Sequence, residues 1–185
     1  MSIFPDVNTT LDLNGPVLSF TSNPSDVSVT VESGTATFTA TAIATFPPSQ
    51  TSRNTNTGSI AYRWYKNNIA LSDGGGVSGS ETTTLTLSGL TSPNDDGSTV
   101  FLRADYVPSA YESGLTANAN NEPVDSSLAR ITVFPTITIT SEPQDTGVVE
   151  DVDTTFTVNV NTTDGSESSL SYQWHLNDSP LSDSS

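Results

Sequence analysis

Few side chains in this sequence are arranged as catalytic or metal chemistry requires. Asp95 and Asp96 are adjacent carboxylates, but they stand in Pro-Asn-Asp-Asp-Gly, a composition typical of a turn. Glu150, Asp151 and Asp153 form a better candidate, because clustered carboxylates are the ligands that calcium prefers. The cluster lacks the alternating ligands and fixed glycine of a calcium loop, so a solvated loop is favoured and the three residues are a weak calcium candidate.

Neither the histidine nor the glycine-rich segment of the chain indicates an enzyme. His175, the only histidine, follows Trp174 directly. Neighbours on a strand face opposite sides, so a core-facing Trp174 puts His175 at the surface, where it is no general base. Residues 74–79, Gly-Gly-Gly-Val-Ser-Gly, have no lysine beside them and no strand-to-helix setting, so a flexible connection between strands C′ and E is favoured over a phosphate cradle or a nucleophile elbow. The sequence predicts a non-enzymatic protein without a cofactor.

Composition excludes several classes of partner. The 21 acidic residues against 5 basic ones give a formal net charge of -16, whose field repels phosphate backbones and anionic lipid heads. There is no cysteine, which excludes disulfides and thiolate metal sites. The first residues lack the features of a signal peptide, and no run approaches the roughly 20 apolar residues of a membrane span. We expect a protein made in the cytoplasm that binds neither nucleic acid nor membrane.

The elements that carry these side chains are predicted to be short β-strands. Aliphatic residues alternate with polar ones, and no segment keeps a helical period over three turns. Glycine, proline, asparagine and aspartate separate the runs as turn residues. Regularly punctuated short strands indicate a sandwich or a barrel. The predicted strands cover residues 27–31, 36–44, 60–65, 83–87, 100–106 and 129–133.

An internal repeat organises the chain. A motif of four residues returns with a constant spacing, and upstream matches extend it, so the chance of coincidence is small. The matches are Tyr62 with Tyr172, Trp64 with Trp174, Leu71 with Leu181 and Asp73 with Asp183 at 110 residues, and Pro24 with Pro143 and Phe38 with Phe156 further upstream. We divide the chain into an extended N-terminal arm (1–16), a whole first repeat (17–134) and the first half of a second repeat (135–185).

The strands of the first repeat resemble those of an immunoglobulin-like domain. Residues 34–40 resemble its B strand, 62–65 a C strand with the core tryptophan, 85–90 an E strand, and 95–102 the E–F corner and F strand. The resemblance implies two packed antiparallel sheets.

This sequence departs from the antibody-type pattern at three positions. Ala40 and Leu102 stand where the paired cysteines would be, and Val100 stands where the corner tyrosine would be. An Ala–Leu pair can fill the gap over Trp64 by packing alone. We therefore expect a cysteine-free sandwich. Its predicted core includes Phe38, Ala40, Tyr62, Trp64, Leu85, Leu87, Val100 and Leu102, and Trp174 begins the same construction in the second repeat.

A closer resemblance covers residues 13–133. Thr-Thr-Leu-Thr-Leu-Ser at 83–88, Leu-Arg-Ala-Asp-Tyr-Val-Pro at 102–108 and Asn-Glu-Pro at 121–123 are similar to immunoglobulin-like repeats in virion structural proteins of large tailed phages that infect marine cyanobacteria. This resemblance implies a location in the virion, in the tail, neck or baseplate or as a fibre-like part, with a role in assembly or host-surface adhesion. Capsid decoration, a bacterial surface adhesin and a carbohydrate-binding module are the alternatives.

Partner contacts are expected in two segments. The arm carries Ile3, Phe4, Val7 and Leu11, which have no place in a sandwich that already has its A strand. The arm is expected to attach the chain to other virion proteins, and a disordered tail is the alternative. Tyr106 and Tyr111 flank the long F–G segment, where a sandwich often presents a binding loop for a glycan or a protein on the host surface, although a plain solvated loop is the favoured interpretation. A homo-oligomer stays open.

The second repeat has equivalents of strands A, B, C and C′ only. Half a sandwich exposes an apolar sheet face and unpaired strand edges. Either the gene product continues beyond Ser185, which the repeat's stop within a loop favours, or another chain supplies the missing strands.

Overall fold

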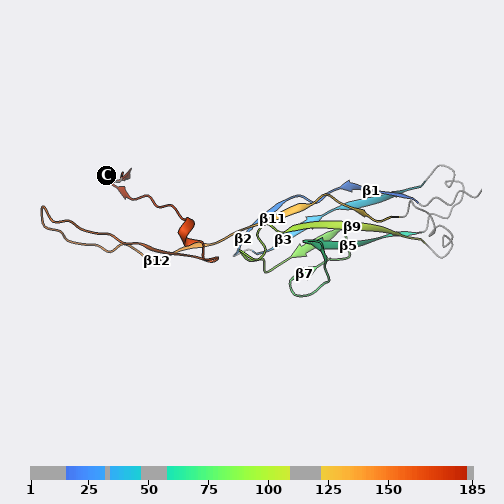
Figure 1. Ribbon diagram of the computed structural model, residues 1–185, viewed down its shortest axis with the longest axis horizontal. Coiled ribbons are helices and arrows are strands. Elements are labelled where there is room, and N and C mark those ends of the chain that lie inside the picture. The colour runs from blue at the N-terminus through green and yellow to red at the C-terminus, as the bar shows by residue number, and fades with distance from the viewer. Residues whose placement is uncertain (1–15, 32–33, 47–57, 109–121, 183–185) are drawn as a thin grey trace, which may run out of the picture.

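The structure is a computed structural model that describes residues 16–31, 34–46, 58–108 and 122–182. Within these ranges the regular elements are β-strands and one short 3-10 helix (Figure 1). The first repeat contains β1 (Val17–Ser22), β2 (Val27–Thr30), β3 (Ala36–Thr39), β4 (Thr41–Thr45), β5 (Ser59–Lys66), β6 (Ile69–Ala70), β7 (Val77–Ser78), β8 (Thr84–Leu87), β9 (Thr99–Val107), β10 (Val124–Asp125) and β11 (Ala129–Phe134). The second contains β12 (Ile137–Ser141), β13 (Asn159–Thr162), η3 (Glu167–Ser169), β14 (His175–Leu176) and β15 (Ser179–Pro180).

The strands of the first repeat form two layers. One sheet has the order β2-β11-β9-β5-β6, with β10 paired to β9, and the other layer consists of β3-β8-β7 and the pair β1-β4. The sequence predicts a single strand over residues 36–44, but the structure divides it into β3 and β4. The division falls at Ala40, because β3 pairs with β8 while β4 pairs with β1. One run of chain thus links both parts of this layer.

The core of the first repeat is built around a tryptophan. Trp64 on β5 is fully buried, as are Ala40 and Leu102, which take the places of a disulfide. The Trp64 indole Nε1 donates a hydrogen bond to the Thr82 carbonyl at 2.8 Å, which satisfies its one polar atom. The Phe38 ring packs at a tilt against the Trp64 ring, and the two ring centroids are 6.4 Å apart. Packing alone therefore closes the space between the layers, and Tyr62 packs at the edge of this cluster.

Tyr106 lies in the core, which corrects its prediction as a partner contact. It is 4% exposed, and its ring packs edge-on against Phe46 with centroids 5.7 Å apart. Side chains alternate along β9, so Tyr106 faces inward with Leu102 and Ala104. Tyr111, and Ile3, Phe4, Val7 and Leu11 of the arm, lie outside the described residues.

The segment 74–79, expected to be a flexible connection, is ordered in the structure. Val77 and Ser78 form β7, which pairs with β8 opposite Leu87 and Thr86. Asp73 accepts a hydrogen bond from the Ser80 backbone N–H at 2.8 Å. This hydrogen bond holds the pKa of Asp73 below its ordinary value. The glycines thus bring a short edge strand onto the sheet.

The second repeat copies the local structure of the first. β12 pairs with β13 as β1 pairs with β4: Ile139 lies opposite Val160 as Phe20 lies opposite Ala42. Both pairs shift register two residues later, at Ser141 and at Ser22. The β14–β15 hairpin likewise copies β5–β6. Its turn residues have positive φ, 48° and 64° at Asn177 and Asp178 against 48° and 65° at Asn67 and Asn68.

Trp174 is not buried, which corrects its prediction as a core residue. It is 42% exposed, while Trp64 at the equivalent position is 0% exposed. Both tryptophans accept the same backbone hydrogen bond, from Leu181 and from Leu71 respectively. The difference is that the described residues of the second repeat supply no strands equivalent to β8, β9 and β11 to cover it.

The two repeats follow each other closely along the chain. β11 ends at Phe134 and β12 begins at Ile137, so only two residues separate the last strand of one from the first strand of the next. Ser92 Oγ lies 3.2 Å from Asp164 Oδ2, which joins the E–F corner of the first repeat to a turn of the second. In Figure 1, β12 and the chain that follows extend away from the end of the sandwich.

Candidate functional site

The outer face of the β5–β9 pair gathers two arginines and two aromatic rings. The two strands are antiparallel, with Tyr65 opposite Phe101 and Arg63 opposite Arg103. Because side chains alternate, these four lie on the side of the sheet away from Trp64 and Leu102. Directly opposed like charges destabilise a sheet unless they are compensated. The charge partners of the two arginines are therefore central to this face.

The rings of Tyr65 and Phe101 stack on each other across the two strands. The rings of Tyr65 and Phe101 are parallel within 3°, with centroids 4.9 Å apart. The Arg103 guanidinium carbon lies 5.0 Å from the Tyr65 centroid and 6.0 Å from that of Phe101. Stacked rings and a cation over a ring face are both favourable arrangements. Phe101 is 7% exposed although it lies on the outer face, so its neighbours shield it from water.

Each arginine has its own carboxylate. Arg103 Nε and Nη2 donate to the two carboxylate oxygens of Asp125 at 2.7 and 2.8 Å. This pairing raises the pKa of Arg103 above its ordinary value. Arg63 donates through Nη1 to the Leu71 carbonyl at 2.8 Å and pairs through Nη2 with Glu81. The charges of the two arginines are thus compensated, and their guanidinium planes are held in place.

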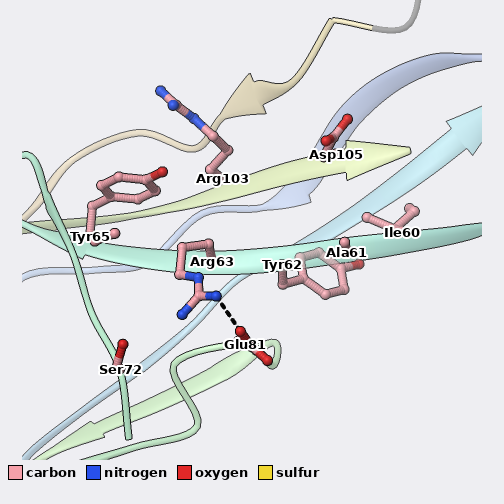
Figure 2. Close-up of a pocket in the computed structure, with 10 residues that line it drawn as sticks. Ile60, Ala61, Tyr62, Arg63, Tyr65, Ser72, Glu81, Arg103 and Asp105 are labelled. Carbon is pink, nitrogen blue, oxygen red and sulfur yellow. Dashed lines mark hydrogen bonds and ion pairs between the residues drawn. The ribbon is translucent and has the colours of Figure 1, made fainter. Parts of the chain in front are cut away.

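A shallow groove of about 770 Å³ is lined by Arg63, Tyr65 and Arg103 of this face (Figure 2). The groove runs along β5, and Ser72, Glu81 and Asp105 add hydroxyl and carboxylate groups at its sides. Its volume falls within the range of small-molecule sites, roughly 300–1,000 Å³. Planar donors and acceptors beside an aromatic face suit the recognition of a polar ligand. Among the lining residues there is no nucleophile paired with a histidine.

The acidic residues that the structure describes do not gather into a metal site. Within the described ranges no three His, Cys, Asp or Glu side chains come close enough to hold a metal ion, and Glu150, Asp151 and Asp153 are all exposed. Asp95 and Asp96 instead accept hydrogen bonds from backbone N–H groups, at 2.8 Å from Thr91 and 3.0 Å from Val133. Their role is to fix the turn, as the composition of that segment indicates.

His175, the remaining candidate residue, lies far from the groove in sequence. It is exposed on the β14–β15 hairpin of the second repeat, whereas the groove belongs to the first repeat.

The sequence alone does not single out Arg63, Phe101 and Arg103 on the outer face of β5 and β9. Alternation along the two strands puts them outward, but only the register of β5 against β9 shows that they are neighbours.

Comparisons with known proteins give the fold and no closer relationship. The chain matches no protein-family model and no curated protein. Among solved structures, Sidekick-1 immunoglobulin domains 1–5 match with a TM-score of 0.51 and 19% identity, over 90% of this chain and 29% of that chain. A chimeric titin Z1Z2 matches with a TM-score of 0.39 and 18% identity, over 92% of this chain and 74% of that chain. Tandem Ig repeats of Dlar match with a TM-score of 0.39 and 19% identity, over 70% of this chain and 56% of that chain. The chain spans less than a third of the length of the Sidekick-1 structures.

The sheet order and the Sidekick-1 match define the class of the protein. It is an all-β, cysteine-free chain of immunoglobulin-like β-sandwich domains in tandem. Immunoglobulin-like repeats are typically non-catalytic, and no enzyme family matches the chain. In the described part of the chain, no helix has the length and apolar character needed to cross a membrane.

Proposed function

We propose that this protein is a structural component of a tailed-phage virion, placed in the tail, neck or baseplate or as a fibre-like part. Its immunoglobulin-like domains project from the particle and make contacts in assembly or at the host surface. The observation that carries the proposal is the close succession of two repeats. Only Pro135 and Thr136 separate their strands, and the Ser92–Asp164 hydrogen bond also connects them. Short junctions restrict the relative motion of domains, which suits a projecting element.

The resemblance of residues 83–88 and 102–108 to phage virion repeats is the reason for proposing a phage particle as the location. A protein that works by contact needs exposed, hydrogen-bonding surface, and the groove over Tyr65 and Arg103 offers it. Attachment is assigned to the arm, because the sandwich already has its first strand in β1. Each segment then has a distinct role, since the arm anchors the chain, the first repeat presents a polar groove, and the second repeat extends the projection.

Immunogold labelling tests the location. Antibodies raised against the first repeat should decorate the tail, neck or baseplate of purified virions, and free protein should block the label. A label on the capsid would favour decoration of the head instead. A label on bacterial envelopes and not on virions would contradict the proposal in favour of an adhesin. Virions that carry the chain without residues 1–16 should lose the label, while the domain keeps its β circular dichroism.

The groove favours one second candidate, a carbohydrate-binding module. Sugar rings stack on aromatic faces, and their hydroxyls bind planar guanidinium and carboxylate groups of the kind that surround Tyr65. On a glycan array, Tyr65→Ala should lose binding that the wild-type chain shows. Leu128→Ala, which changes an apolar side chain that is 61% exposed and outside the groove, is the control. Absence of binding by the wild-type chain to any glycan would end this second hypothesis.

A further inference from the structure

One side of β5, in the first repeat, is an open sheet edge along the first half of the strand. On that side β6 pairs with β5 only at Tyr65 and Lys66. The backbone of Trp64 also bonds there, because its N–H donates to the Ser80 carbonyl at 2.8 Å and its carbonyl accepts from the Leu71 N–H at 2.9 Å. Before Trp64, no strand of the described part of the chain pairs with this side of β5.

The pairing of β5 with β9 determines which backbone groups point to the open edge. In an antiparallel pair, opposite residues either bond each other or direct their N–H and C=O groups away from each other, in alternation. Trp64 is of the second kind, since its groups bond away from Leu102, its partner on β9. Ile60 and Tyr62 follow at every second residue, so each presents an N–H and a carbonyl to the open edge. Among the described residues, no backbone group bonds them there.

The groove described above passes along this edge. Its lining includes Ile60 and Tyr62, whose side chains point inward, and Ala61 and Arg63, whose side chains point outward (Figure 2). A groove meets both kinds of side chain where it borders the edge of a strand. Ile60, Tyr62 and the neighbouring Phe46 are only partly buried. An extended segment seated here can therefore pair with four backbone groups and cover these apolar side chains.

The arm contains a segment with the pattern that such a strand needs. Residues 6–13 read Asp-Val-Asn-Thr-Thr-Leu-Asp-Leu, so the apolar side chains Val7, Leu11 and Leu13 all stand at odd positions. This alternation predicts a strand with one apolar side and one polar side. Seated on the edge, the apolar side would cover the inward side chains, and an aspartate of the polar side would lie on the same face as Arg63.

The position of β1 favours the arm of a second copy over the arm of the same chain. Only residues 14–16 separate Leu13 from Val17, the first residue of β1, and four extended steps span at most about 14 Å. β1 lies in the other layer, about 10 Å away, where it contacts β9 and β10. A strand docked on β5 would lie two strand spacings beyond β9, about 10 Å further. The direct path of about 14 Å leaves no length for a turn into the docked strand.

We propose that residues 6–13 of one copy of the chain add as a β-strand to the open edge of β5 in a second copy. The charged side chains that line the groove are Arg63, Arg103, Glu81 and Asp105, which balance, so the acidic arm meets no net negative charge there. The proposal names a partner for the arm and rests on the attachment role that the proposed function gives to it. Association of the purified chain is measured without virions, so its failure and a failure of the virion label are separate results.

Sedimentation velocity of the whole 185-residue chain tests the proposal. It should show species larger than a monomer, with a share that rises with protein concentration. An excess of a peptide that copies residues 5–14 should return the chain to the monomer. The backbone amides of Ile60 and Tyr62 should exchange their hydrogens more slowly where the chain associates than in dilute solution. A monomer at every concentration would overturn the proposal.

Two variants at one position of β5 test the edge itself. Ile60→Pro removes an N–H that points to the open edge and leaves the pairing with β9 intact, as proline at a strand edge allows. It should weaken association by at least about tenfold, because the docked strand loses a hydrogen bond and meets the proline ring. Ile60→Ala, which shortens the same side chain but keeps the N–H, should associate much more like the wild type.

Two variants of the arm leave the sandwich unchanged. Leu11→Asp puts a charge on the apolar side of residues 6–13 and should abolish association, because an unpaired carboxylate would be buried. Thr10→Asp adds the same charge to the polar side and should associate as the wild type does. Equal loss in both variants would show that charge alone, and not the alternation of the strand, controls association.

The remaining outcomes each count against the proposal. Association that persists in Ile60→Pro would place the contact away from the edge of β5. A monomer whose Ile60 and Tyr62 amides are protected, with the protection lost in Leu11→Asp, would place the arm on its own chain. Association that a peptide of the same composition without alternation also reverses would show unspecific adhesion.

Discussion

The two repeats share a local structure but differ in burial. The hairpin turns have the same φ values within one degree, and β12–β13 repeats the register and the irregularity of β1–β4. Yet Phe38 is 2% exposed and its equivalent Phe156 is 49% exposed. Turns and hairpins are formed by residues near one another in sequence, whereas burial depends on distant strands. The comparison separates what a short sequence determines locally from what a complete sandwich adds.

The largest expected difference concerns the two tryptophans. Trp64→Ala should destabilise the first repeat by about 3–5 kcal/mol, because it opens a large cavity and leaves the Thr82 carbonyl without its donor. Trp174→Ala should cost less than about 1 kcal/mol, because little packing is lost at an exposed position. Urea denaturation followed by circular dichroism measures both. Equal losses would show that Trp174 is already covered in solution and that the two repeats do not differ in burial there.

Two glycines with similar backbone angles give the next largest difference. Gly79 in the first repeat has φ +78°, and a Cβ there would lie 2.1 Å from the Thr84 carbonyl oxygen. Gly165 in the second repeat has φ +74°, and a Cβ there would meet nothing within 4 Å. Gly165→Ala should therefore cost only the left-handed backbone penalty, about 1–2 kcal/mol. Gly79→Ala should cost about 1–3 kcal/mol more, because the clash displaces β8.

Thermal unfolding measures the loss of stability in Gly79→Ala and in Gly165→Ala. The difference between the two losses is the steric contribution at Gly79. If Gly79→Ala proves as mild as Gly165→Ala, the 74–79 connection does not pack against β8 in solution. The edge strand β7 would then be the flexible loop that the sequence alone predicts.

The sequence predicts strands that match β2, β5, β8, β9 and β11, because alternation and turn residues are local signals, but β1, β6, β7 and β10 are not among the predicted strands. The cover over Trp64 follows from the resemblance to an immunoglobulin-like domain. β9, for example, extends the predicted strand at 100–106 by one residue at each end. Alternation along β9 also places Tyr106 inward. The prediction of a partner contact for Tyr106 follows instead from its position next to a long loop. The motif shared with Trp64 predicts a core position for Trp174, yet the motif carries no information on the strands that must cover it.

The groove was not predictable in the same way. Arg63 and Arg103 are 40 positions apart in the sequence, and their proximity follows from the register of β5 against β9. Their partners Glu81 and Asp125 come from a loop and a two-residue strand that no periodicity indicates. A site assembled from cross-strand neighbours thus requires the pairing of the strands as well as their existence.

The smallest expected effect concerns Asp95, in the turn between β8 and β9 of the first repeat. Burial alone would raise the pKa of Asp95, but its hydrogen bonds from Lys66 and from the Thr91 backbone lower it below the ordinary value of 3.8. A carboxyl whose pKa is lower in the folded state contributes stability above its unfolded pKa and loses it as pH falls through the folded pKa. Asp95→Asn should therefore cost about 1.5–3 kcal/mol at pH 7, since hydrogen bonds to a charged group are lost.

Urea denaturation at a series of pH values checks this prediction. The gap between wild type and Asp95→Asn should be constant above about pH 5 and should close as the wild-type carboxyl is protonated below its ordinary pKa. Asp164→Asn in the second repeat is the matched comparison, because hydrogen bonds also lower the pKa of Asp164, mainly the one from Ser166, but at an exposed position. Its effect should be smaller at every pH, since solvent screens an exposed charge. A gap for Asp95→Asn that did not change with pH would mean that the amide disrupts the turn by its shape, and that the charge of Asp95 contributes nothing to the difference between the repeats.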